Sequence, residues 1–492
     1  MEKYKIKDIL GITFFALGII CLIYMFLTPL NHVIMHMDEY FTLTLTTLPL
    51  SDIITITSSD VHPPVYYILA KGVAQIAEMT GADPLSSLRV LSIIPYIIIL
   101  VISAVKIRKD YGLFTAGLFA FAMAVMSEFF QHFLIIRMYS WAILFLLIAF
   151  LAFKEIIETQ DIKAWIVLTV FSVLCAYTHY FAAISAICLY LTLLAYLLKF
   201  KRDKIKIWGI STAAAIALYL PWTYSLLTQL NTIHGSYWIT QVNHIKLINA
   251  LGYFAYSNET AINAIAILIL IAIISIYSKH TTANEKDKFI IKSGFSVYLG
   301  TIILPILISV IFQPILVVRY LLPATAVLWL TISILVTKIE DKKMFMISVG
   351  LIGLLLISGV VATIHSNEGT YYNGICQTEI LNNITEDPNS MLIITNKNMI
   401  MYFLDYANKT DMYCLDVSPV FGESMDQLHT FYDFKTFKTK DLNSLIADNA
   451  DKNIYIISWG DPAVNQTTVP LNSEAGMIFS KVNTTNNVTT NR

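Results

Sequence analysis

Long apolar runs separated by short polar stretches dominate this chain of 492 residues. A helix needs about 20 mostly apolar residues to cross the hydrocarbon core of a bilayer. Eleven runs come near that length, at residues 9–28, 88–105, 113–126, 134–153, 165–178, 181–198, 207–221, 262–277, 289–311, 317–336 and 344–363. No small-residue cleavage site follows the first run, so we interpret it as an anchor and not as a signal peptide. The pattern predicts an α-helical polytopic membrane protein with about eleven transmembrane helices.

One further segment, residues 64–79, decides the topology. It is apolar, but it contains Lys71, Gln75 and Glu78 and begins with a proline that follows another proline. This combination suits a helix that lies in the membrane interface. We therefore predict an interfacial helix in the first external loop, and we leave this segment out of the crossings.

The distribution of Lys and Arg supports this choice. The predicted cytoplasmic side then holds 20 basic residues, and the opposite side before residue 365 holds five, which are Lys71, Arg89, Arg137, Lys246 and Arg319. An excess of positive charge in short cytoplasmic loops is the usual signature of membrane orientation. We predict a multi-pass protein of the cell (plasma) membrane with a cytoplasmic N-terminus and an extracytoplasmic C-terminal domain.

The composition agrees with this class of protein. Hydrophobic residues make up 56% of the chain and charged residues 14%, with a mean hydropathy of +0.65. Such values exclude a soluble domain of ordinary composition. The sequence contains no P-loop, GxGxxG, CxxC or HExxH motif, so nucleotide hydrolysis is not suggested, and we expect no nucleic-acid partner.

The composition changes after residue 364. Short apolar runs at 391–395, 412–417 and 453–458 are typical of strands, and the stretches at 398–407 and 442–450 are typical of helices. We predict a transmembrane domain at 1–364, a small extracytoplasmic α/β domain at 365–482 and a disordered tail at 483–492. Cys376 and Cys414 share the external domain, and a disulfide between them stays open.

Polar residues from five separate stretches converge on the predicted outer surface. They are Asp38, Glu39, Asp60, His62, Arg137, His179 and Arg319. Ionisable residues near membrane segments are costly and often functional. Each also has a plainer interpretation: Arg137 reaching the lipid headgroups, His179 capping a helix, and Asp38 with Glu39 starting the next helix.

The order of the polar motifs resembles a known family. The motifs are Asp38-Glu39, His62-Pro63-Pro64-Val65-Tyr66-Tyr67, Ser127-Glu128 with Arg137-Met138-Tyr139, Thr178-His179-Tyr180-Phe181, Ser236-Tyr237-Trp238-Ile239 and Arg319-Tyr320-Leu321-Leu322-Pro323. In this order they resemble the GT-C membrane glycosyltransferases, in the branch of the protein O-mannosyltransferases and aminoarabinose transferases (glycosyltransferase family 39-like). The resemblance covers about residues 1–364, and the ordered set carries it, since no single motif is specific.

The resemblance implies an enzyme that transfers one sugar, in the manner of hexosyl- or mannosyltransferases. The donor would be a polyprenyl (dolichyl or undecaprenyl) phosphate, and the acceptor a glycan, lipid or protein on the extracytoplasmic face of the bilayer. Displacement of the lipid phosphate needs a base for the acceptor hydroxyl and cations or donors for the phosphate. By resemblance Asp38 is the catalytic acidic residue, and it fits the base. Glu39 would orient the acceptor or support Asp38.

For the donor phosphate the candidates are Arg137 and Arg319, whose guanidinium groups match phosphate oxygens, and His62. In the aminoarabinose-transferring relatives a Lys precedes the proline, whereas His62 stands there in this chain. The remaining predicted substrate-binding residues are Asp60, Tyr66, Tyr139, His179, Tyr180, Trp238 and Tyr320. Carboxylate and imidazole suit several metals, so a divalent ion among Asp60, His62 and His179 stays open, and no other cofactor is expected. Direct displacement would invert the anomeric configuration.

Two other functions compete with this interpretation. A transporter or flippase of lipid-linked sugars would show repeats and charges near the membrane midplane, and we find no repeat and few such charges. An oligosaccharyltransferase or glycan ligase would move a preassembled glycan. The sequence does not reveal which sugar is moved or which acceptor receives it.

Overall fold

The computed structural model describes most of the chain. The described residues are 2–28, 37–126, 128–233, 239–255, 259–281, 283–395, 409–415, 435–438, 441–459, 468–472 and 477–482. The chain divides into two compact units, each described below by itself. The first comprises Met1–Leu30 and Leu45–Asn367, and the second comprises Asn31–Thr44 and Glu368–Arg492.

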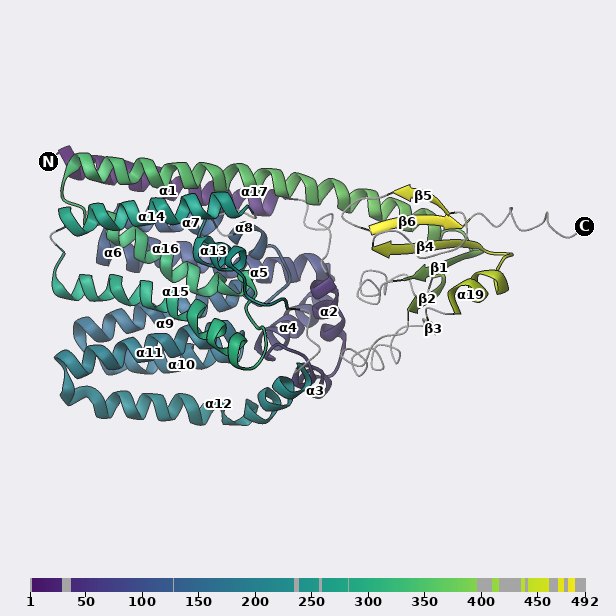
Figure 1. Cartoon of the computed structure of the whole chain (residues 1–492), viewed down its shortest axis with the longest axis horizontal. Coiled ribbons are helices and arrows are strands. Elements are labelled where there is room, and N and C mark those ends of the chain that lie inside the picture. Colours follow the sequence, from purple (N-terminus) through teal and green to yellow (C-terminus); the bar gives the residue numbers. More distant parts are fainter. Residues whose placement is uncertain are drawn as a thin grey trace, which may run out of the picture. The chain divides into compact units, whose positions relative to one another are not determined.

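Long helices running side by side build most of the first unit (Figure 1). The second helix up to Thr44 and the last helix after Asn367 belong to the second unit. In chain order the helices are α1 (Glu2–Leu27), α2 (Met37–Thr47), α3 (Leu50–Ser59), α4 (Val65–Thr80), α5 (Pro84–Ile102), η1 (Ser103–Ile107), α6 (Arg108–Tyr111), α7 (Leu113–Val125), α8 (Phe129–His132), α9 (Tyr139–Thr159), α10 (Ile162–Ala176), α11 (Tyr180–Phe200), η2 (Arg202–Lys204), α12 (Ile205–Ile233), α13 (His244–Gly252), α14 (Thr260–His280), α15 (Glu285–Ile311), η3 (Val318–Leu321), α16 (Leu322–Thr337) and α17 (Lys342–Thr385).

Within the described residues, nine helices are long and apolar enough to cross a membrane. They cover Lys5–Leu27, Pro84–Tyr111, Tyr139–Thr159, Tyr180–Phe200, Arg202–Asn231, Thr260–His280, Glu285–Ile311, Val318–Thr337 and Lys342–His365. Two shorter apolar helices, α7 and α10, account for the other two predicted runs. The prediction of a polytopic helical membrane protein is therefore confirmed.

The two shorter helices differ from the predicted crossings in length. α7 has 13 residues and α10 has 15, which corresponds to only about 20 Å of helix for each. α7 follows Gly112, whose positive φ of 88° a residue with a side chain rarely adopts. The described side chains of α7 after Leu113 are buried, so neighbouring helices cover it.

The segment predicted as an interfacial helix forms α4. It starts after Pro63 and Pro64 and ends at Gly81, which adopts a left-handed conformation with a φ of 69°. With 16 residues, α4 is not among the described helices that are long and apolar enough to cross a membrane. Without α4, eleven apolar runs were predicted. Within the described residues, the structure shows them as nine long and two short apolar helices.

Ion pairs cluster at one end of the bundle. The Lys154 side chain, on the last turns of α9, is buried and lies 2.6 Å from both Asp110 and Glu158. Lys106 pairs with Glu155 at 2.6 Å. α9 has 21 residues and is therefore about 30 Å long, so its first residue, Tyr139, lies at the opposite end of the bundle from these charges.

The second unit contains a six-stranded mixed sheet in the order β3-β2-β1-β4-β6-β5 (Figure 1). Its elements are β1 (Ser390–Ile394), β2 (Asp411–Leu415), β3 (Lys435–Phe437), α19 (Leu442–Asp448), β4 (Asn453–Trp459), β5 (Thr468–Asn472) and β6 (Met477–Val482). The first four strands in this order are parallel, whereas β6 is antiparallel to β4 and β5. Met391, Ile393, Ile454 and Ile456 contribute to its core with Leu442 and Ile446 of α19.

The strands predicted at 391–395, 412–417 and 453–458 are β1, β2 and β4, and the helix predicted at 442–450 is α19. β3, β5 and β6 were not predicted. The helix predicted at 398–407, the tail at 483–492 and the side chain of Cys376 lie outside the described residues, so the question of a Cys376–Cys414 disulfide stays open.

Candidate functional site

Asp60 and His62 come directly after α3, in the connection to α4. The backbone N–H of Asp60 donates to the carbonyl of Ile56 at 3.0 Å and ends the helix. Nδ1 of His62 lies 3.2 Å from Oδ2 of Asp60, and both side chains are largely shielded from solvent. Next to the two prolines, the N–H of Val65 donates to the carbonyl of Tyr177 at 3.2 Å. This bond ties the His62 segment to the connection between α10 and α11.

Arg137 lies just before α9 and is only 2% exposed. Its Nη1 donates to the Tyr67 hydroxyl at 3.1 Å, and its Nη2 lies 3.4 Å from Nδ1 of His62. The guanidinium carbon is 5.9 Å from the centre of the Tyr67 ring, a distance at which a cation is attracted to an aromatic face. The arginine is therefore held next to His62 by a tyrosine of α4.

His179 caps the N-terminus of α11. Its Nδ1 accepts a hydrogen bond from the backbone N–H of Phe181 at 3.2 Å. Burial, together with the charges of His62, Arg137 and Arg319, holds the pKa of His179 well below its ordinary value. A neutral imidazole that accepts at Nδ1 carries its proton on Nε2. His179 is thus a neutral hydrogen-bond donor in a buried position.

Aromatic rings connect His179 to the remaining cluster. The centre of its ring lies 5.0 Å from that of Tyr320, 5.5 Å from that of Tyr139 and 6.2 Å from that of His62. Arg319 is exposed, and its guanidinium carbon lies 5.9 Å from the ring centre of its neighbour Tyr320. The sequence-predicted residues Asp60, His62, Arg137, Tyr139, His179, Arg319 and Tyr320 therefore come together within the first unit, and we call them the polar cluster.

In the sequence, Glu128 was noted only as part of a motif. In the structure, both its backbone conformation and its electrostatic environment are unusual. Its φ of 58° is positive, which is uncommon for a residue with a side chain and often marks a functional site. Burial raises the pKa of the Glu128 carboxyl, and this rise is opposed by the charge of Arg319 and by the nearby Tyr253 hydroxyl. The positive charge of Arg319 therefore acts on the Glu128 carboxyl.

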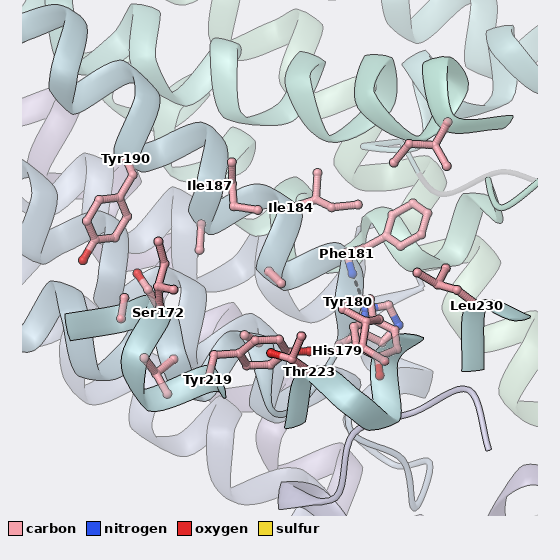
Figure 2. A pocket seen from close by; sticks show the side chains of 18 of the residues that line it. Ser172, His179, Tyr180, Phe181, Ile184, Ile187, Tyr190, Tyr219, Thr223 and Leu230 are labelled. Atoms are coloured by element: carbon pink, nitrogen blue, oxygen red, sulfur yellow. Dashed lines mark hydrogen bonds between the residues drawn. The ribbon is translucent and has the colours of Figure 1, made fainter. Parts of the chain in front are cut away.

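An apolar cavity of about 700 Å³ adjoins the polar cluster. Residues of α10, α11 and α12 supply most of its walls, and His62, His179 and Tyr320 line it as well. In Figure 2, Ser172 and Tyr190 lie toward one end of the cavity, and His179, Tyr180 and Leu230 lie toward the other. A cavity with apolar walls and a polar end suits a ligand with an apolar chain and a polar head.

Four other predicted site residues lie elsewhere or are not placed. Tyr66 is fully buried, and its hydroxyl lies 3.3 Å from that of Ser92 on α5. The neighbouring Tyr67, which the sequence analysis noted only as part of a motif, contacts Arg137 instead. Asp38 and Glu39 occupy the first turn of α2, in a segment that belongs to the second unit, so their catalytic role stays a prediction. Trp238 lies outside the described residues.

Tyr180 belongs to a separate hydrogen-bonded group. Its hydroxyl donates to Oε1 of Gln229 and accepts from Nε1 of Trp222 at 3.1 Å. Both partners are on α12, and nothing in the periodicity of that helix singles out the glutamine. Tyr180 also lines the cavity.

The metal set left open by the sequence does not form. Asp60 and His62 pair with each other, and Nδ1 of His179 accepts a backbone N–H. In the part of the chain that the structure describes, no group of three or more His, Cys, Asp or Glu side chains is placed to hold a metal ion.

The fold is that of the GT-C class of polytopic membrane proteins, as the resemblance in sequence predicted. Two solved structures are similar to this chain: ArnT, the aminoarabinose transferase, from Cupriavidus metallidurans in the apo state and bound to undecaprenyl phosphate. The TM-scores are 0.56 and 0.55, each at 10% sequence identity, and each match covers 96% of this chain and 98% or 97% of the other chain. No family model and no curated protein matches. The similarity at this identity concerns the fold.

Proposed function

We propose that this protein is an integral-membrane glycosyltransferase that moves a single sugar from a polyprenyl-phosphate donor to an acceptor at the extracytoplasmic face. The observation that carries the proposal is the apolar cavity that ends at His62 and His179, beside the polar cluster. A polyprenyl phosphate has the matching shape, because it joins a long hydrocarbon chain to an anionic head. Undecaprenyl phosphate bound to one of the similar structures supports the same donor class.

The orientation of the protein follows from its charges. The Lys-rich ends of the helices, such as the end of α9 that carries Lys154, belong in the cytoplasm by the positive-inside rule. The polar cluster is at the start of α9, near Tyr139, and therefore faces outward. A sugar attached to a lipid phosphate would sit at the same depth, since its anomeric carbon lies at the headgroup level.

Within the cluster each group has a chemical role. Arg137, Arg319 and His62 bind the donor phosphate, and the two guanidinium groups stabilise the negative charge that it gains as it leaves. His179 presents Nε2–H as a neutral donor. The rings of Tyr139 and Tyr320 both lie next to the ring of His179 and offer apolar faces for the sugar.

Asp38 is the proposed base that takes the proton of the acceptor hydroxyl, and Glu39 supports it. The acceptor oxygen then forms a bond to the anomeric carbon as the bond from that carbon to the phosphate oxygen breaks, which inverts the configuration. Residues 1–364 form the catalytic domain in this proposal, and residues 365–482 form an external α/β domain.

The test is a transfer assay on the purified full-length protein in lipid nanodiscs. Undecaprenyl- and dolichyl-phosphate sugars are supplied in turn with extracted envelope glycans, lipids and proteins. The mass of each product is measured by mass spectrometry, and its anomeric configuration is determined by NMR. A gain of one sugar with inverted configuration supports the proposal. A gain of a preassembled block identifies a glycan ligase, and a retained configuration contradicts the displacement mechanism. Failure to bind any polyprenyl phosphate would overturn the donor assignment.

A further inference from the structure

Gln229 is a buried amide near the end of α12. It is 3% exposed, and its neighbours Leu226 and Leu230 line the cavity with it. A buried amide is costly unless its donors and acceptors are paired. Here Nε2 of Gln229 donates to the carbonyl of Thr57 at 2.8 Å, and Oε1 accepts from the hydroxyl of Tyr180. Packing alone would be served better by an aliphatic side chain.

The two partners of Gln229 belong to the two segments that supply the polar cluster. Thr57 lies in the last turn of α3, where carbonyls have no partner within the helix, and Asp60 follows three residues later. Tyr180 is the residue after His179 at the start of α11. A third bond, from Nε1 of Trp222 to the Tyr180 hydroxyl at 3.1 Å, fixes the tyrosine from a different turn of α12. One amide thus joins the end of α3 to the start of α11.

We propose that Gln229 is a positioning residue that sets the spacing between the Asp60–His62 pair and His179. This inference rests on the proposed function, because it assigns Gln229 an effect on the phosphate site without contact with the reacting atoms. The centres of the His62 and His179 rings are 6.2 Å apart, and both line the polar end of the cavity. Loss of the bond to Thr57 releases the end of α3, so Asp60 and His62 move relative to His179.

The experiment compares three variants of the full-length protein in nanodiscs. Gln229→Met keeps the length of the side chain and removes both hydrogen bonds. Gln229→Glu keeps an acceptor for the Tyr180 hydroxyl but, when ionised, has no donor for the carbonyl of Thr57. Gln75→Met makes the same change at an exposed glutamine of α4 and is the matched control. Hydrogen exchange of the peptide that covers α3 is measured together with transfer kinetics.

We expect Gln229→Met to lower kcat about tenfold to a hundredfold, in the range that displacements of about 1 Å produce. KM for the lipid donor should change less than about threefold, since the apolar walls remain. Amides of α3 should exchange faster than in Gln75→Met, and Gln229→Glu should be at least as impaired as Gln229→Met. A purely structural role would instead lower the melting temperature and leave the kcat of the folded protein unchanged.

The outcomes separate this inference from the proposed function. If the wild type transfers no sugar, the proposed function fails, and the positioning role of Gln229 fails with it. If the wild type is active and Gln229→Met matches Gln75→Met in kcat and in exchange of α3, only the positioning role is overturned. Full activity of Gln229→Glu at a pH at which its carboxyl is ionised would likewise overturn the role of the bond to Thr57.

Discussion

The adjacent tyrosines of α4 provide the sharpest test of the polar cluster. Tyr66 and Tyr67 are both fully buried, and both have hydroxyls within hydrogen-bond distance of a partner. Tyr67 accepts from Arg137 at 3.1 Å, whereas Tyr66 lies 3.3 Å from the Ser92 hydroxyl. Replacing each by phenylalanine removes one oxygen atom in the same helix and leaves the ring in place. The two variants therefore differ only in which partner loses its bond.

The expected magnitudes follow from the charge of the partner. A hydrogen bond to a charged group contributes about 1.5–3 kcal/mol, and one between neutral groups about 0.5–1.5 kcal/mol. Without the Tyr67 hydroxyl, the guanidinium of Arg137 loses one of the bonds that hold it beside His62, and part of its ordering must be supplied when the phosphate binds. Tyr67→Phe should therefore weaken donor binding about 10-fold to 150-fold. Tyr66→Phe should lower thermal stability and change donor affinity less than about threefold.

The assay is a Kd for undecaprenyl phosphate, measured on purified protein in nanodiscs by native mass spectrometry. It needs no acceptor, so the acceptor's identity does not affect the result. Thermal unfolding of both variants is recorded in parallel, because it separates a lost contact from a lost fold. Equal weakening in Tyr66→Phe and Tyr67→Phe, or wild-type affinity in Tyr67→Phe, would refute the placement of Arg137 in the phosphate site.

Three further predictions address the base, the buried histidine and the cavity. Asp38→Asn should reduce transfer by at least about a thousandfold and leave the Kd for undecaprenyl phosphate unchanged, because a base acts on the acceptor; measurable turnover near the wild-type rate would remove Asp38 from this role. His179 has a folded pKa below its unfolded value of about 6.5, so its contribution to stability is present above about pH 6.5 and is lost as the pH falls, by at most about 1.4 kcal/mol per pH unit. His179→Asn keeps an acceptor for the N–H of Phe181 but cannot titrate, so its melting temperature should fall less than that of the wild type between about pH 7.5 and about pH 5.5, and an equal fall would contradict the assignment. Ala215→Trp fills the cavity and should weaken binding of undecaprenyl phosphate about tenfold or more, whereas Ala217→Trp, on an exposed face of the same helix, should not; equal Kd values would show that the cavity does not hold the lipid.

The fold was predictable because its signals are distributed over the whole chain. Each crossing depends on the average hydropathy of many residues, and the orientation depends on 25 basic residues counted together. Even the exclusion of α4 from the crossings followed from this count. The strands β3, β5 and β6 were missed. β3 has only three residues, and β5 contains Pro470, a residue that argues against a strand when it stands in a sequence pattern.

The polar cluster was predictable in its residues but not in its contacts. The count of basic residues predicted His62, Arg137 and His179 on one side of the membrane, and the structure brings them together. Consecutive residues of a helix point about 100° apart, so the sequence does not tell which of two adjacent tyrosines faces the arginine. Gln229 was missed because its hydrogen-bond partners lie on two other helices, and the sequence does not show which helices pack together.

The fold depends on properties averaged over many residues, so it can be shared with ArnT at a sequence identity of 10%. The proposed site depends on single hydrogen bonds, so its function must be tested by substitutions that remove one bond at a time. Helix packing depends on a few close approaches: a Cβ at Gly117 would lie 2.1 Å from the carbonyl oxygen of Gly11, so α1 and α7 meet backbone to backbone. The cavity needs only apolar walls, which many residue types supply. A phosphate bound at the polar end of that cavity needs donors at fixed positions, and these depend on bonds such as that between Tyr67 and Arg137. In the proposed function, two proteins that share the fold can therefore use different donors and acceptors when the few side chains around His62 and His179 differ.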